Sequence, residues 1–165
     1  MAEADVLGDE FAGAFEHAFA RLRCEVEAAC ADTAKRDRPV RVAVGVKTAF
    51  AFAAAHPDAT QLLTNETLAH GGERGVVLYQ RMISYFASLL ISARDPDSDE
   101  QGRSTVVEEA TVGGVALLVG RRLACNRESE LPAIACEAIQ FILTPWVGIE
   151  RARQIANEHC GTAAS

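Results

Sequence analysis

Positive charge is scarce in this sequence. Its 16 Lys and Arg residues stand against 23 Asp and Glu residues, which gives a formal charge of -7, and Lys35 and Lys47 are the only lysines. Proteins that hold nucleic-acid phosphates need the opposite balance, because Lys and Arg make most of those contacts. The shortage argues against direct nucleic-acid binding by this chain.

The five cysteines form neither an even set nor a C-x-x-C motif. A disulfide framework is typical of short secreted chains with paired cysteines. We therefore expect buried thiols that pack as small apolar side chains. The N-terminus lacks the basic-then-apolar order of a signal peptide, and no apolar stretch reaches the length of a membrane span. The predicted location is cytoplasmic, with no membrane contact.

Motifs of known chemistry are missing as well. The sequence has no G-x-S-x-G, no H-E-x-x-H, no phosphate-binding loop and no G-x-G-x-x-G. Glu66 and His70 are four residues apart and could share a helix face, but no second pair completes a metal site. We expect no enzymatic activity, no cofactor and no metal. The alternative is a stand-alone helical enzyme or carrier for a hydrophobic metabolite.

Apolar residues, and alanine above all, are what the sequence does contain. They make up 49% of 165 residues, whereas aromatic residues make up 6%. Alanine favours helices and is a poor strand former. The length fits one domain with a core of its own, spanning residues 1–165.

Apolar residues recur at steps of three and four along most of the chain, which is the signature of amphipathic helices. The pattern predicts a single-domain, all-α bundle of about six to seven helices. A loop rich in Asp, Ser, Pro and Gly separates two of them at 94–103. The expected helices cover 9–34, 42–55, 58–70, 73–93, 105–124, 131–144 and 148–159.

One segment is ambiguous. Val40, Val42, Val44 and Val46 alternate, as in a strand. An isolated strand would have no partner elsewhere in the chain, so we favour a helix. Pro145 is expected to interrupt the helix that starts at Leu131.

Three stretches together resemble TetR-family transcriptional regulators. The end of those proteins is similar to two runs of this sequence, Leu131-Pro132 and Phe141-Ile142-Leu143-Thr144-Pro145-Trp146-Val147-Gly148-Ile149-Glu150-Arg151-Ala152. Residues 110–115 with Val119 resemble their penultimate long helix. Phe50, His56-Pro57, Leu62-Leu63 and Glu66 resemble the middle of their ligand-binding domain. The resemblance covers about residues 4–156.

This resemblance implies a TetR C-terminal-like bundle that binds a small apolar effector and forms a homodimer. The helix-turn-helix domain of the family is absent from this sequence. We therefore expect DNA contact only through a helix-turn-helix domain that is not present in this chain.

The resemblance also implies where the two sites lie. The pocket is expected among helices 9–34, 42–55, 73–93 and 105–124. Its predicted ligand contacts are Phe15, Phe19, Phe50, Leu63, Tyr79, Met82, Phe86, Thr111 and Val115, with His17, Thr64, Tyr85 and Glu108 as further polar candidates. In the family the last two long helices form a four-helix dimer interface, here predicted to use Gly113, Gly114, Leu118, Phe141, Ile142 and Trp146.

Overall fold

The computed structural model describes residues 2–33, 37–92 and 105–160, and every regular element within these ranges is helical. The all-α prediction is therefore confirmed. The predicted loop at 94–103 lies outside the described residues. The helices are α1 (Ala2–Asp32), α2 (Arg38–Ala55), α3 (Pro57–Gln61), the π-helical turn η1 (Leu62–Glu66), α4 (Thr67–His70), α5 (Gly72–Ser92), α6 (Val106–Ala124), the 3-10 turn η2 (Glu128–Glu130), α7 (Leu131–Val147) and α8 (Ile149–Cys160).

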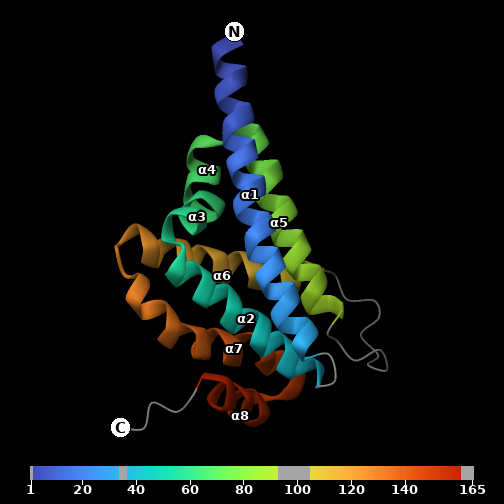
Figure 1. Ribbon diagram of the computed structural model, residues 1–165. Helices are drawn as coiled ribbons and strands as arrows, with labels where there is room; N and C mark the ends of the chain where they lie inside the picture. The colour runs from blue at the N-terminus through green and yellow to red at the C-terminus, as the bar shows by residue number, and fades with distance from the viewer. Residues whose placement is uncertain (1, 34–36, 93–104, 161–165) are drawn as a thin grey trace.

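Helix α2 is the central element of the bundle. It contributes buried side chains to all three apolar clusters of the core: Phe52 to the cluster with α1 and α5, Ala43 to the cluster with α7 and α8, and Phe50 to the cluster with α6 and α7. Figure 1 shows α2 between the long α1 and helix α7. Because α2 is covered on several sides, its sequence is apolar nearly all round.

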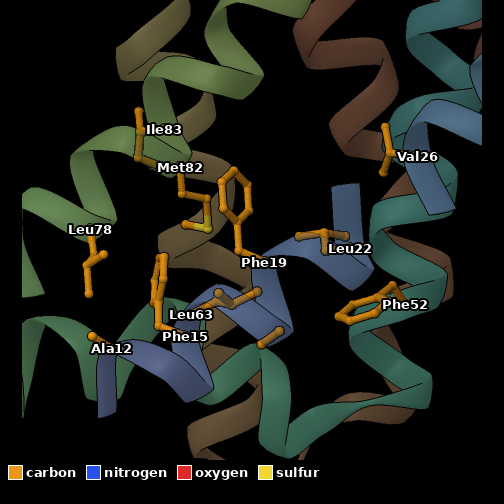
Figure 2. Packing of buried hydrophobic residues seen from close by; sticks show 11 residues of the cluster. Ala12, Phe15, Phe19, Leu22, Val26, Phe52, Leu63, Leu78, Met82 and Ile83 are labelled. Atoms are coloured by element: carbon orange, nitrogen blue, oxygen red, sulfur yellow. The ribbon is translucent and has the colours of Figure 1, made fainter. Parts of the chain in front are cut away.

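The long helices α1 and α5 share one cluster of aromatic and aliphatic side chains. Phe19 makes edge-on contacts with Tyr85 and Phe86, at ring-centroid distances of 5.6 Å and 6.2 Å. Figure 2 shows Phe15 and Phe19 of α1 beside Met82 of α5. Buried aromatic side chains such as Phe15 and Phe19 contribute heavily to the stability of a core.

The valine-rich segment at 40–46 belongs to a helix, as expected. Helix α2 begins at Arg38, four residues before the predicted start, and Pro39 lies in its first turn. Proline is well accommodated there because the amide hydrogen that it lacks would have no partner within the helix. The earlier start places Arg38 and Arg41 on the helix.

Pro145 does not end α7, contrary to expectation. The helix continues to Val147 and ends at Gly148, whose φ of 77° favours glycine. Pro145 cannot donate a hydrogen bond to the carbonyl of Phe141, but both residues are exposed, so water can solvate that carbonyl. The amide of Gly148 still donates to Thr144 O at 3.1 Å.

The cysteines differ from the prediction of buried thiols. A disulfide joins Cys136 of α7 to Cys160 of α8, with their Cα atoms 5.8 Å apart. Cys24 and Cys125 are free but exposed, and Cys30 is partly buried. Sequence spacing could not reveal the pairing, because the two partners are 24 residues apart on separate helices.

Among the described residues, α5 alone is long and apolar enough to span a membrane by length and composition. This differs from the expectation that no apolar stretch of the sequence reaches the length of a membrane span. Core helices of soluble proteins pass the same test, and α5 buries Leu78, Met82 and Ile83 against α1. The observation is weak support for a membrane helix.

Candidate functional site

An elongated apolar cavity runs through the interior beside α2. Its volume is about 380 Å³, and its wall is formed mainly by α1, α2, α5 and α6. Wall residues occur on α2 from Arg38 to Ala53. Arg38 and Ala53 are fifteen residues apart, which corresponds to about 22 Å along the helix axis at about 1.5 Å per residue.

Small side chains on α2 and α6 keep the space open. Ala49 and Ala116 are partly buried and line the cavity. Gly45 lies where α1 comes close: a Cβ there would be 3.2 Å from Cys30 Sγ and 3.6 Å from Val26 Cγ1. Larger residues at the two alanines would project into the space that the cavity occupies.

Five of the nine predicted ligand contacts line this cavity. They are Phe50, Leu63, Met82, Phe86 and Val115, to which Thr64 is added from the further polar candidates. They come from four different helical segments, and the fold brings them together around one space.

The other four predicted contacts lie elsewhere. The wall begins at Leu22 on α1 and at Met82 on α5, so Phe15, Phe19 and Tyr79 lie nearer the N-termini of these helices. Phe15 and Phe19 are buried in the α1–α5 core instead. The wall residues of α6 do not include Thr111, whose hydroxyl donates to Val107 O at 2.7 Å.

Three further polar candidates also lie outside the wall. His17 is exposed, Glu108 is buried, and Tyr85 is turned to a carboxylate on α1. The hydroxyl of Tyr85 donates to Glu27 Oε1. Burial, followed by this hydrogen bond and the charge of Glu27, raises the pKa of Tyr85 to about 12.

Two threonines place polar atoms near the end of the cavity where α2 finishes. The hydroxyl of Thr60 donates to His56 O at 3.0 Å, and that of Thr64 donates to Thr60 O at 2.8 Å. Each hydroxyl oxygen keeps lone pairs that can accept a further hydrogen bond. Thr60 was not anticipated from the sequence.

Charged groups of the wall occur at the other end, where α1 finishes and α2 starts. They are Glu27, Arg38 and Arg41. Neither arginine was predicted from the sequence, because the helix was expected to start at Val42 and not at Arg38. The aspartate and proline that flank Arg38 were the available signal, since an N-cap residue and a first-turn proline mark a helix start.

Cys30 also lines this end of the cavity. Its thiol contacts Arg41 O at 3.6 Å. Burial raises the pKa of this thiol, and the nearby Arg41 charge opposes the rise only in part. The neutral thiol is therefore favoured, and it adds a weakly polar group to the wall.

The predicted interface residues are divided between surface and interior. Phe141 is 65% exposed on α7, and Gly114 is exposed on α6. Gly113, Leu118 and Trp146 are partly buried. Ile142 is a correction: it is buried and lines the cavity, because it faces inward while its neighbour Phe141 faces outward.

The last pair of residues considered from the sequence, as possible metal ligands, does not form a site with other side chains of the described ranges. Glu66 and His70 are exposed and do not line the cavity. Within residues 2–33, 37–92 and 105–160, no cluster of three or more His, Cys, Asp or Glu side chains could hold a metal ion.

Comparison with known proteins gives no neighbour for this chain: no family model, no curated protein and no solved structure matches it.

Proposed function

We propose that this chain is the effector-binding and homodimerisation domain of a TetR-like transcriptional regulator that senses a small apolar molecule. The observation that carries the proposal is the elongated apolar cavity beside α2. The resemblance of residues 110–115 and 131–152 to that family supplies the rest.

The size and lining of the cavity support ligand binding. Small-molecule sites commonly occupy about 300–1,000 Å³ and are mostly apolar with a few polar groups. The cavity of about 380 Å³ lies within this range, and Thr60 and Thr64 supply polar atoms inside it. Protein interiors otherwise contain few voids larger than a water molecule. A cavity of this size in a bundle of 165 residues is therefore better explained by a bound ligand than by imperfect packing.

Exposed apolar side chains on α6 and α7 support self-association. Val107 and Leu117 of α6 and Phe141 of α7 are all more than half exposed. Gly114 lies between the first two on the same face of α6, and a Cβ there would meet no atom within 4 Å. Such a surface permits close approach of a second helix, as the family interface requires.

Helix α6 offers a physical route from ligand to dimer. Val115 and Val119 line the cavity, whereas Gly114 and Leu117 of the same helix are exposed. A ligand that displaces the inner side of α6 would displace its outer side as well. Binding would then favour one arrangement of two subunits over another, as in a population shift.

Filling the cavity tests the proposal. We expect wild-type protein to bind the neutral dye N-phenyl-1-naphthylamine with enhanced fluorescence. Ala49→Phe places a ring in the cavity and should weaken that binding at least about tenfold, because dye and ring compete for one space. Ala51→Phe is the matched control, since Ala51 is an exposed alanine of the same helix. Equal dye affinity in Ala49→Phe and wild type would contradict the proposal.

No feature of the described residues specifically favours the alternative of a stand-alone enzyme or carrier. Its candidate pair, Glu66 and His70, lies away from the cavity. A turnover assay that depends on either residue would favour that alternative over the regulator.

A further inference from the structure

The charged side chains of the cavity wall are gathered at one end. Glu27 lies on the last turns of α1, and Arg38 and Arg41 lie on the first turns of α2. Ser92, the last residue of α5, belongs to the same end, and all four are exposed. This end is the mouth of the cavity. Along the remainder of α2 the wall residues are apolar.

The negative group at the mouth is already engaged. Glu27 accepts a hydrogen bond from the hydroxyl of Tyr85, and its carboxylate lies 3.6 Å from Arg23 Nε. Asp37, next to the start of α2, lies 3.7 Å from Arg151 of α8. The contacts of these two carboxylates are therefore with Arg23, Tyr85 and Arg151, and not with Arg41.

Arg41 is the available cation. No carboxylate in the described part of the chain lies within 4.0 Å of its guanidinium group. Arg38 lies three residues earlier, on the same side of the helix, and adds a second positive charge. The amino-terminal end of α2 contributes a further partial positive charge. These local charges oppose the net charge of -7 on the whole chain.

From this arrangement we propose that the occupant is a linear alkyl carboxylate, with its tail along α2 and its headgroup at Arg41. The proposal rests on the ligand-binding function argued above and adds the chemical class of the ligand. A guanidinium group recognises a carboxylate through two parallel hydrogen bonds. The tail follows the apolar wall toward Leu63, for which the length of about 22 Å leaves room.

Three amphiphiles with the same tail test the headgroup. They are dodecanoate, dodecanol and dodecyltrimethylammonium, each titrated below its micelle concentration against the bound naphthylamine dye. Wild-type protein should bind dodecanoate about 5- to 50-fold more tightly than dodecanol, as expected for a charge-assisted hydrogen bond. The cationic amphiphile should bind most weakly.

Substitution of Arg41 tests whether this side chain causes the preference for dodecanoate over dodecanol. Arg41→Gln should reduce the advantage of dodecanoate over dodecanol to less than about threefold, while dodecanol affinity stays within about twofold of wild type. Arg153→Gln removes an exposed arginine of α8 outside the wall and should keep the full preference. Thermal melts of both variants verify that they are folded.

The outcomes separate this inference from the proposed function. Equal binding of dodecanoate and dodecanol by wild type, or an unchanged preference in Arg41→Gln, overturns the headgroup assignment. Another outcome is that wild type binds the dye and Ala49→Phe weakens that binding, while no alkyl chain displaces the dye. In that case the ligand class is wrong and the binding site stands. If the dye does not bind, both proposals fall.

Discussion

A single glycine determines how closely α6 can approach η1. A Cβ at Gly120 would lie 2.5 Å from Asn65 Oδ1 and 2.9 Å from Thr64 Oγ1. The side-chain amide of Asn65 donates to Gly120 O at 2.8 Å, so the contact is also hydrogen-bonded. We expect Gly120→Ala to lower the free energy of unfolding by about 1–3 kcal/mol, as overpacking does. Urea denaturation measures the change.

The control for that substitution is Gly13→Ala. Gly13 is exposed on α1, and an added Cβ would meet no atom within 4 Å. Alanine there should raise the free energy of unfolding by about 0.5–1 kcal/mol, because glycine is a poor helix former. A Gly120→Ala variant as stable as Gly13→Ala would show that α6 and η1 are not in this contact.

Tyr85 gives a prediction about pH. Its pKa is raised from 10.0 to about 12, so the protonated phenol is favoured in the folded state. Its contribution to stability is complete below pH 10.0 and is lost as the pH rises through about 12. In Tyr79→Phe, which leaves Tyr85 as the one tyrosine, the ultraviolet absorbance of tyrosinate should appear with a midpoint near 12.

Glu27→Gln in the Tyr79→Phe variant separates the causes of the raised Tyr85 pKa. Burial is the largest cause of the raised pKa, and the hydrogen bond to Glu27 and its charge come next. The midpoint should therefore fall only part of the way toward 10.0. A midpoint that does not move would contradict the Tyr85–Glu27 contact.

At the scale of elements, the disulfide fixes α8 to α7. Reduction, or Cys136→Ser, should lower the free energy of unfolding by about 2–4 kcal/mol, because the cross-link restricts the unfolded chain. Cys24→Ser is the matched control, since Cys24 is free and exposed. Peptide mapping without reductant should recover Cys136 linked to Cys160. Separate peptides would contradict the pairing.

Sequence periodicity predicted the helices well because each one buries a continuous face. Helix α2 was recognised despite its alternating valines, since its inner face recurs at Val42, Val46 and Ala49. Its start was missed, because the charges of Arg38 and Arg41 look like a polar linker when the first-turn proline is not given weight. The exposure of Phe141 and Pro145, which allows α7 to continue, follows from packing that periodicity does not report.

The candidate site was predicted less completely than the fold, for a geometric reason. Periodicity indicates which face of a helix points inward but not where along its length a neighbour crosses it. Phe15 and Phe19 share a face with Leu22, yet the cavity wall begins only at Leu22. Phe50 and Val115 do line the cavity, because they lie within the stretches of α2 and α6 that form its wall, residues 38–53 and 112–119.

At the scale of the whole molecule, the exposed side chains of α6 and α7 predict a dimer. Leu117 and Phe141 are 58% and 65% exposed. Leu117→Glu with Phe141→Glu should convert a dimer to a monomer in sedimentation velocity, because charges would be buried without partners. Val77→Glu is the matched control: Val77 is 66% exposed on α5, outside the proposed interface. A strictly monomeric wild type at high micromolar concentration would contradict self-association.

The central claim is that the space beside α2 receives an apolar chain, and crystallography with a bromine label tests it most directly. Crystals would be grown with a dodecyl carboxylate whose tail ends in bromine, and the anomalous signal of bromine would be located. The account predicts one peak per chain between α2 and α6, near Leu63 and Val119. A peak on the outer surface, or no peak at saturating ligand, would contradict it.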